Sequence, residues 1–394
     1  MLGSLAATAC ANIFGVGDLT AVAEQPAEAG SAGSRHAPSA GGGGKAAGSS
    51  GGSIFAVGSA GTTFTMGNGG TAAIAGTDST SASAGAAAGA ADPLEQLPSC
   101  AELPPTCGSS ESTSRDCCAS GEVPAGSFFR SYDGLRDVGS DDPSWPASIS
   151  AFRLDTYEVT VGRFRRFVDA YPFRPAAGAG KNPANSSDFG WNSAWNAELP
   201  RDAEALSVEL ETCGTAIRAE PSMSTWTASP DGNEALPINC LTWFEAFAFC
   251  AWDEGRLPSE TEWNYAAAGG SEARVYPWAS RAATDIEPNL AVYQSPIAKV
   301  GSKPLGNGLF GQADLAGNVW EWNVDWYRET YSVPCDDCAE LTADVDISDR
   351  VLRGGGYYNQ PPFLRAAARG NAPPKTRDPG YGVRCARGGT DNGR

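Results

Sequence analysis

Apolar side chains recur with helical spacing soon after residue 160. Thr160 stands where a helix would begin, and its hydroxyl can cap the free backbone N–H groups of the first turn. Four residues that follow fall on one face of a helix: Val161, Phe164, Phe167 and Val168. The stretch before them, 152–160, predicts a strand that leads into this helix.

Two further helices are predicted by capping boxes, in which a Ser or Thr and a Glu three residues later satisfy each other's backbone N–H groups. Thr242 and Glu245 form the first box, and Ser259 and Glu262 form the second. Apolar residues follow both boxes with helical spacing: Trp243, Ala246, Phe247 and Cys250, then Trp263, Ala266 and Ala267.

The rest of the domain shows little periodicity. Residues 169–236 are rich in Gly, Pro, Asn and Trp and predict a long irregular stretch. Beyond Gly269 the pattern favours turns and short strands. Together these features indicate an α+β domain with two or three helices and little regular secondary structure.

Large apolar residues are unevenly distributed along the chain. All 11 tryptophans lie between Trp145 and Trp326. Gly, Ala and Ser dominate 21–96, which cannot bury enough apolar surface to offset the entropy of ordering. Three parts are therefore expected: a lipoprotein-like N-terminus over 1–20, a disordered tether over 21–96, and one disulfide-stapled domain over 97–390 with a cysteine-rich start at 97–120.

The N-terminus indicates the compartment. ATAC at 7–10 has the small-residue pattern of a bacterial lipobox, in which Cys10 would be lipidated. The preceding segment is shorter than a signal peptide and lacks its basic region, so either the true start lies upstream or the match is accidental. Since no run of about 20 apolar residues is present, membrane contact is expected only through a lipid anchor. We predict an extracytoplasmic protein, secreted or held at the cell envelope of a bacterium.

Charge and histidine content exclude several classes of function. The net charge is −18 and the basic residues are scattered, so no nucleic-acid partner is expected. The only histidine, His36, lies in the predicted tether. The domain therefore lacks the imidazole needed for Ser-His-Asp or Cys-His nucleophiles and for His-rich metal sites. Nor does it contain a Walker loop or a dinucleotide-binding fingerprint.

Apart from Cys10, the chain holds ten cysteines, an even number that is typical of disulfides in an oxidising compartment. The adjacent Cys117 and Cys118 are expected to bind different partners, because a ring closed by two neighbours is strained. Their candidate partners stay open: Cys100, Cys107, Cys213 and Cys240.

Cys335 and Cys338 enclose two aspartates. The spacing is that of a redox-active pair, but the two carboxylates should raise the thiol pKa, which opposes reactivity. We therefore predict a small structural loop. A zinc site is less favoured, because exported thiols oxidise and no histidine is nearby.

Several motifs follow one another in a specific order: DTYEVT (155–160), PINCLTWFEA (237–246), FCAW (249–252), GRLPSETEWNY (255–265), YPW (276–278), DLAGNVWEW (314–322), RGG (353–355) and GVRCA (382–386). Together they resemble the formylglycine-generating enzyme, or sulfatase-modifying factor, family over about residues 120–388. The resemblance implies a fold related to C-type lectins and a disulfide between Cys250 and Cys385.

Members of that family oxidise a sulfatase cysteine to formylglycine with oxygen and a copper(I) ion held by two cysteines. Here Asn359 stands where the first copper cysteine is expected, and the second position falls near Pro361. No cysteine occurs between Cys338 and Cys385. Because neither Asn nor Pro replaces a thiolate, copper oxidation is expected to be absent. Replacement of the pair by Cys335 and Cys338 is disfavoured, since both precede the site.

Two interpretations of function follow. In the first, the domain is a non-catalytic module that binds a peptide, protein or glycan in the former substrate groove, unless the aromatic residues there are core. The candidate groove residues are Tyr357, Tyr358, Asn359, Gln360, Phe363, Arg365 and Arg369. In the second, the domain is a formylglycine-generating oxidase or catalyses another reaction through carboxylates. Glu245, Glu262 and Glu321 are the candidates, although capping boxes already account for two of them.

The resemblance also implies calcium, which favours oxygen ligands. Asn318 and Glu321 match family ligands, and Asn289 matches a ligand of a second site whose acidic partner is not evident. The alternative at 318–321 is a turn held by hydrogen bonds without metal.

Overall fold

The computed structural model describes most of the predicted domain. The described residues are 97–100, 107, 117–135, 142–213, 223–278, 286–343 and 347–389. The predictions about Cys10, the N-terminus and the tether lie outside them. Of the helices that the described residues form, none is long and apolar enough to cross a bilayer.

Three helices lie where the sequence predicts them: α1 (Val161–Asp169), α3 (Trp243–Trp252) and α4 (Glu260–Ala267). Thr160 Oγ1 caps α1 by accepting a hydrogen bond from a backbone N–H of the first turn at 3.2 Å. Both capping boxes form. In the second, Ser259 N donates to Glu262 Oε2 at 2.9 Å, and Glu262 N donates to Ser259 Oγ at 3.1 Å.

A further helix, α2 (Ala203–Glu211), lies within the stretch 169–236 that the sequence pattern predicts to be irregular. The Asp202 carboxylate caps it by accepting a backbone hydrogen bond at 2.8 Å. The buried residues of this helix are Leu206 and Leu210. With only two buried leucines in nine residues, the periodic signal is weak, which is why the prediction missed the helix.

The strands form three small sheets. Their bounds are β1 (Ser120–Val123), β2 (Gly126–Phe129), β3 (Pro146–Ile149), β4 (Phe152–Asp155), β5 (Trp320–Trp326), β6 (Arg350–Arg353), β7 (Gly370–Ala372), β8 (Tyr381–Gly382) and β9 (Ala386–Gly388). In the first sheet β4 is central, with β1 and β9 antiparallel to it on either side. The second is the antiparallel pair of β2 and β3, and the third has the order β7-β6-β5-β8.

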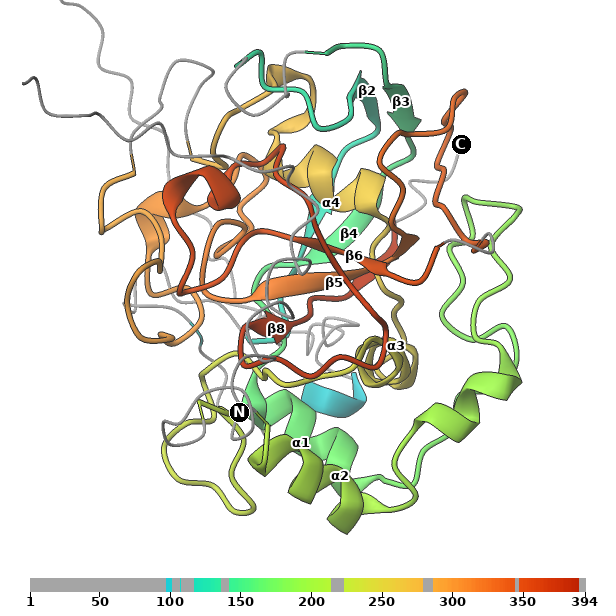
Figure 1. Ribbon diagram of the computed structural model, residues 1–394, viewed down its shortest axis with the longest axis vertical. Coiled ribbons are helices and arrows are strands. Elements are labelled where there is room, and N and C mark those ends of the chain that lie inside the picture. The colour runs from blue at the N-terminus through green and yellow to red at the C-terminus, as the bar shows by residue number, and fades with distance from the viewer. Residues whose placement is uncertain are drawn as a thin grey trace, which may run out of the picture. The chain divides into compact units, whose positions relative to one another are not determined.

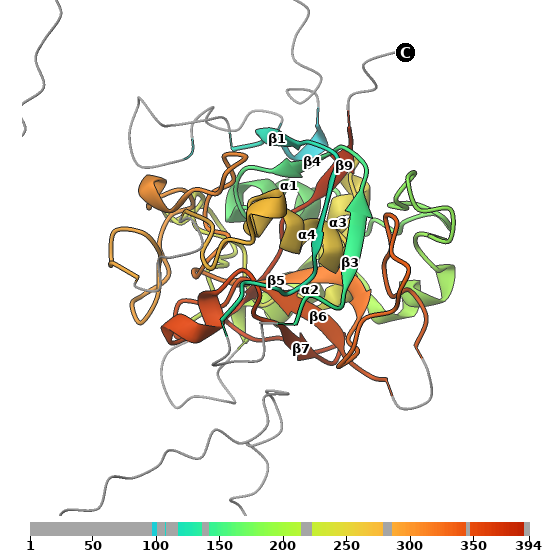
Figure 2. The same ribbon diagram turned by 90° about the horizontal axis from the view of Figure 1, so that it is seen from above.

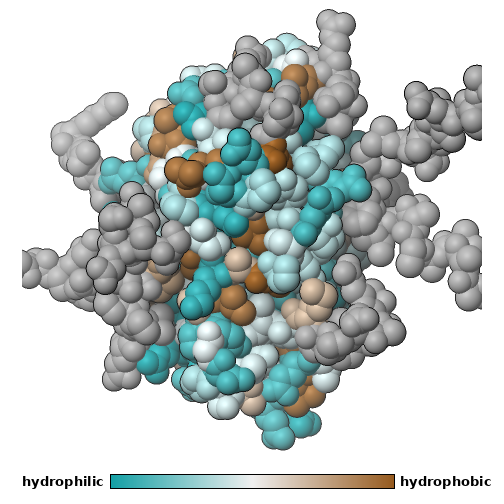
Figure 3. Space-filling view, turned by 90° about the vertical axis from the view of Figure 1, so that its left-hand side faces the viewer, coloured by the Kyte–Doolittle hydropathy of each residue, from teal (hydrophilic) through white to brown (hydrophobic). Residues whose placement is uncertain are grey.

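Helices α3 and α4 lie between the sheet that contains β4 and the sheet that contains β5 (Figure 2). Helices α1 and α2 lie at one end of the domain, and β2 and β3 lie at the other (Figure 1). The largest group of buried apolar side chains surrounds α3. There the Phe164 ring of α1 stacks on the Phe249 ring, with centroids 5.5 Å apart. On the face shown in Figure 3, exposed apolar residues form small groups among polar ones, as is usual for protein surfaces.

Disulfides staple the described residues at five places: Cys100–Cys118, Cys107–Cys117, Cys213–Cys240, Cys250–Cys385 and Cys335–Cys338. The adjacent Cys117 and Cys118 bind different partners, as predicted. The Cys250–Cys385 bond is the one that the resemblance implies.

Loop length predicts which disulfide stabilises the domain most. In the chain-entropy account, Cys250–Cys385, with a sequence separation of 135, is worth about 5 kcal/mol, and Cys335–Cys338, with a separation of 3, about 2 kcal/mol. The double variant C250A/C385A should therefore lose more free energy of unfolding than C335A/C338A in urea titrations followed by tryptophan fluorescence. Equal losses in the two variants would contradict this ranking.

Candidate functional site

The segment that matches the copper region of the resembled family runs from the end of β6 to the start of β7. Asn359, at the first copper position, is only 7% exposed. Its Oδ1 accepts hydrogen bonds from Trp320 Nε1 and from the Gly356 backbone N–H, both at 2.8 Å. Pro361, at the second position, starts a short 3-10 helix, Pro361–Leu364. Asn359 thus holds this segment against β5, and Pro361 begins a helical turn.

The aromatic residues predicted to line a ligand groove are largely part of the packed interior. Tyr357 is buried and its hydroxyl donates to Met223 Sδ at 3.2 Å. The Tyr358 ring stands against the Tyr357 ring with centroids 5.1 Å apart. Tyr358 and Phe363 are half-buried, and Gln360 is exposed. Tyr357 is therefore a core residue and does not line a ligand groove.

The two arginines predicted beside that groove form ion pairs inside the domain instead. Arg365 Nε donates to Asp133 Oδ2 at 2.9 Å, and Arg369 Nε donates to Glu260 Oε1 at 2.6 Å. The Arg369 guanidinium also lies 4.3 Å from the centroid of the Tyr331 ring. Both side chains join distant segments of the chain, which differs from the predicted role at a ligand surface.

Glu321, a predicted calcium ligand, is saturated by protein donors. Its two oxygens accept hydrogen bonds from Arg384 Nη2 at 2.7 Å and Nε at 2.6 Å. Trp263 Nε1 donates to it as well, at 2.7 Å. A carboxylate compensated in this way by a guanidinium does not fit a second positive charge.

The other predicted calcium ligands do not join Glu321 in a cation site. Asn318 Nδ2 donates to Glu158 Oε2 at 2.6 Å, and its Oδ1 accepts from the Ala298 backbone N–H at 3.1 Å. Its φ of 61° is in the left-handed region, which Asn tolerates better than most residues. Asn289 lies exposed in a turn. Among the described residues, no group of three His, Cys, Asp or Glu side chains could hold a metal ion.

The carboxylates considered for an enzyme without cysteines are also paired. Glu262 forms an ion pair with Arg256 at 2.6 Å. Glu245 Oε2 accepts from Arg377 Nη1 at 2.6 Å. Because both also bind the backbone N–H of a helix cap, their lone pairs are engaged in holding α3 and α4 in place.

Three carboxylates lie close to one arginine in the core. Glu158 and Asp314 are near the ion pair of Glu321 and Arg384. Burial, reinforced by the charges of Asp314 and Glu321, raises the pKa of Glu158 well above its usual range. Burial also raises the pKa of Asp314 to about 6. One guanidinium cannot compensate three carboxylates, so Glu158 and Asp314 favour their protonated, neutral forms.

A second polar cluster lines a cavity of about 40 Å³ at the start of α4. Glu260 accepts there from Arg369, from Arg353 at 2.8 Å and from the Tyr331 hydroxyl at 3.1 Å. Burial favours its neutral form, but Arg369 and Arg353 lower the pKa of Glu260 to about 2. Burial, together with the charge of Glu260, raises the pKa of Asp325 to about 7.

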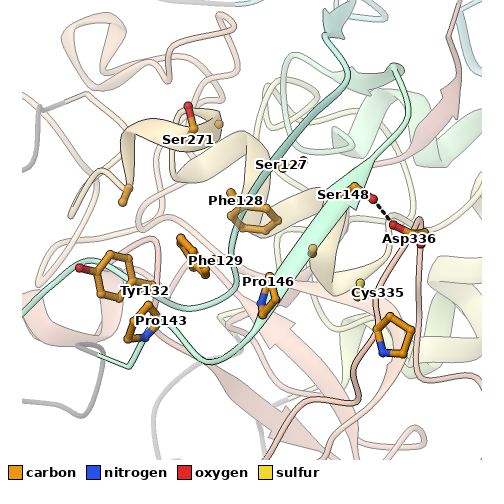
Figure 4. Close-up of a pocket in the computed structure, with 14 residues that line it drawn as sticks. Ser127, Phe128, Phe129, Tyr132, Pro143, Pro146, Ser148, Ser271, Cys335 and Asp336 are labelled. Atoms are coloured by element: carbon orange, nitrogen blue, oxygen red, sulfur yellow. Dashed lines mark hydrogen bonds between the residues drawn. The ribbon is translucent and has the colours of Figure 1, made fainter.

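A groove of about 600 Å³ opens beside β2 and β3 (Figure 4). Aromatic residues, prolines and small residues line it: Ser127, Phe128, Phe129, Tyr132, Pro143, Pro146, Ala147, Ser148, Gly270, Ser271, Ala273, Pro334, Cys335 and Asp336. Phe129 is 44% exposed. Of these residues the sequence pattern singles out Cys335 alone, because the lining comes from segments that are far apart in the chain.

The shifted carboxyl groups predict that the domain is more stable in mildly acidic solution than at neutral pH. Glu158, Asp314 and Asp325 have raised pKa values, so folding takes up protons between about pH 4 and pH 7, and stability falls as pH rises through that range. Glu260, with its pKa lowered to about 2, acts oppositely, and its contribution is lost only as pH falls below about 4.5.

We therefore expect a higher urea midpoint at about pH 5 than at about pH 7.5. The variant Asp325→Asn, which cannot ionise, should show a smaller difference between the two conditions. A midpoint that is equal or higher at the neutral pH would contradict the assignment of these groups.

Comparison with known proteins places the fold in a wider context. Residues 109–388 match the sulfatase-modifying factor enzyme 1-like domain. The chain is 26% identical over 295 residues to the formylglycine-generating enzyme of Mus musculus, which covers 67% of this chain and 73% of that protein. It is 28% identical over 295 residues to the inactive C-alpha-formylglycine-generating enzyme 2 of Mus musculus, which covers 67% of this chain and 84% of that protein.

The solved structure of PvdO from Pseudomonas aeruginosa aligns with a TM-score of 0.45 at 22% identity, covering 73% of this chain and 100% of that one. The predicted fold, with little regular secondary structure and several disulfides, is confirmed. Because the family match spans well over half of its length, the chain belongs to the sulfatase-modifying factor enzyme 1-like domain family.

Proposed function

We propose that this domain binds an extended polypeptide in the groove beside β2 and β3 and lacks the copper-dependent oxidation expected of its family. The groove itself carries the proposal. Its volume of about 600 Å³ lies in the usual range of ligand sites, and an exposed aromatic ring, Phe129, stands in its lining. A bulky apolar side chain of a ligand would bury its surface against these rings.

The chemistry of the lining favours a polypeptide over a glycan. Sugar hydroxyls require several hydrogen-bonding partners, whereas this lining consists mainly of aromatic rings, prolines and alanines. Asp336 is the one charged residue among the described residues of the lining, and its carboxylate accepts a hydrogen bond from Ser148 (Figure 4). Surfaces of aromatic rings and prolines bind apolar and proline-containing peptides well.

Charge narrows the class of ligand further. The chain has a net charge of −18, and Asp336 at the groove is exposed. Complementary charge speeds the encounter of partners and selects among them. The proposed ligand is therefore an extended segment with a central apolar residue and basic flanks.

The absence of copper oxidation is supported by the state of the cysteines. The domain has ten cysteines, and all of them pair in disulfides. Asn359 and Pro361 occupy the two copper positions, and the Asn359 amide oxygen is engaged by Trp320. Copper(I) requires soft ligands such as thiolates, which this arrangement does not offer.

Peptide binding can be tested with two variants that each remove one exposed phenylalanine. The probes are synthetic peptides with a central Leu, Phe or Pro between lysines, measured by fluorescence anisotropy. Phe129→Ser should weaken binding about tenfold, because burial of an aromatic ring in a ligand site is worth at least 1–2 kcal/mol. Phe189 is 46% exposed, against 44% for Phe129, and lies outside the groove, so Phe189→Ser is the matched control.

The control variant should bind within about twofold of the unchanged protein. Equal weakening by both substitutions, or binding of a glycan panel in preference to the peptides, would refute the proposed site.

Copper oxidation can be tested with a Cys-x-Pro-x-Arg peptide, Cu(I) and oxygen, with an active formylglycine-generating enzyme as the positive control. Mass spectrometry should find no conversion of the peptide cysteine to an aldehyde by the oxidatively folded protein. Turnover would show that another copper site exists, and Cys335 and Cys338 would be the first residues to replace.

A further inference from the structure

The Cys335–Cys338 disulfide differs from the others in its position and surroundings. It spans three positions, whereas the other described disulfides span 10 to 135, so it adds the least to stability through loop closure. Cys335 belongs to the lining of the groove (Figure 4). Cys338 belongs to the lining of the 40 Å³ cavity. Cys338 is also partly exposed to solvent. This disulfide therefore lies between a small cavity and a groove that is large enough to admit part of a polypeptide.

A buried cation points at this disulfide. Arg130 is 3% exposed, and its Nη1 donates to Cys338 Sγ at 3.4 Å. Its Nη2 donates to the Ser332 carbonyl oxygen at 2.7 Å, and its guanidinium lies 4.5 Å from the centroid of the Tyr331 ring. With the described residues Arg130 forms no ion pair, and its Nε has no hydrogen-bond partner. A thiolate at Cys338 would supply the negative charge that this buried guanidinium lacks.

The start of α4 places a second hydrogen-bond donor beside the sulfurs. Thr261, in the first turn of the helix, places its hydroxyl 3.7 Å from Cys338 Sγ and 3.9 Å from Cys335 Sγ. A hydroxyl at this distance can donate a hydrogen bond to a thiolate, and thiol pKa values fall beside arginines. Two independent donors, the guanidinium and the Thr261 hydroxyl, thus favour a thiolate at the same sulfur.

The aspartates between the cysteines are held away from them. The Asp336 carboxylate accepts from the Ser148 hydroxyl, and the two Asp337 oxygens accept from Ser150 N and Oγ, both at 2.7 Å. These contacts direct both carboxylates toward β3 and its end. The sequence-based argument against a reactive pair assumed that they act on the thiols, and the structure weakens that assumption.

The other charged groups around the cavity have partners of their own. Glu260 is paired with Arg353 and Arg369, and Glu340 is paired with Arg328 at 2.9 Å. The oxygens of Asp325 accept two backbone N–H groups, from Glu260 at 2.6 Å and Glu340 at 2.8 Å. The charges of Glu260 and Asp325 also act on Arg130, but neither carboxylate forms an ion pair with it among the described residues. A thiolate at Cys338 would be the anion in direct contact with this guanidinium.

We propose that Cys335 and Cys338 form a redox-active pair that exchanges its disulfide with dithiols of exported polypeptides. A substrate thiolate attacks Cys338 Sγ, the bond between the two cysteines breaks, and Cys335 leaves as a thiolate that takes up a proton. The second substrate thiolate attacks the substrate sulfur of the mixed disulfide and releases Cys338 as a thiolate beside Arg130. Two electrons pass from the substrate dithiol to the protein, so the substrate leaves with a disulfide.

This activity goes beyond the proposed binding function and does not require it, because Cys338 is partly exposed to solvent. Its first test uses the oxidised full chain equilibrated with mixtures of reduced and oxidised dithiothreitol, followed by acid quenching, alkylation and peptide mapping. Cys335–Cys338 should be half reduced in a mixture about 100-fold less reducing than Cys107–Cys117 requires, since labile disulfides have higher reduction potentials. Reduction of Cys335–Cys338 only together with the buried disulfides would overturn the proposal.

The second test asks whether Arg130 lowers the pKa of the Cys338 thiol. With the pair reduced, the rate of Cys338 alkylation by iodoacetamide is measured against pH. Arg130→Met should raise the apparent pKa of the thiol by about one unit, a tenfold loss of rate below that pKa, whereas Arg130→Lys should keep most of the effect. Arg328→Met removes a charge from the same cavity without touching sulfur and serves as the matched control.

An unchanged profile in Arg130→Met, or an equal change in Arg328→Met, would refute the role of Arg130. Circular dichroism checks that each variant is folded. If a variant does not fold, the order in which the disulfides of the unchanged protein are reduced still tests whether the Cys335–Cys338 pair is redox-active. Peptides without cysteine, measured with Phe129→Ser, test groove binding separately, so either proposal can fail alone.

Discussion

Buried guanidinium groups supply hydrogen bonds that the short strands of this domain cannot. Backbone carbonyls in irregular segments need donors once they are buried, and each arginine brings five N–H groups. Arg163 joins Asp155 of β4 to Asp253 at the end of α3, and Arg387 of β9 bridges the same two carboxylates. Arg384 pairs with Glu321 and also donates hydrogen bonds to the backbone carbonyls of three residues. The packing of α1, α3 and the first sheet depends on this network, because removal of one partner would leave a charge buried without compensation.

Local signals account for what the sequence could predict, and contacts between distant segments account for what it could not. The caps of α1, α3 and α4 lie within four residues of the groups that they satisfy, so they can be recognised from the chain alone. The helix α2 gives a weaker signal, with two buried leucines. Arg365 pairs with Asp133, 232 positions away, and Arg369 pairs with Glu260, 109 positions away. No local pattern could show that these arginines serve the core, or that four remote segments would form the groove.

The segment that matches the copper region of the family is held by hydrogen bonds within the chain. Motif spacing located this segment, but only the structure shows that Asn359 accepts hydrogen bonds from Trp320 and Gly356. These bonds keep the segment attached to β5 without a ligand. The groove and the Cys335–Cys338 pair meet at 334–336 on another part of the surface, so any present activity need not reuse the original site. A binding surface and an exchangeable disulfide would then share one short stretch of chain.

The first sheet has a mechanical consequence. β1 and β9 flank β4 and run in the same direction, with Ser120 at the start of β1 opposite Asp155 and Gly388 at the end of β9 opposite Phe152. Tension applied between these two ends of the domain would pull the outer strands lengthwise in opposite directions. Hydrogen bonds loaded in this shear geometry share the force, whereas a strand peeled from its end breaks them one at a time. The Cys250–Cys385 disulfide also anchors the chain just before β9. The domain should therefore resist unfolding by a force that pulls on its two ends.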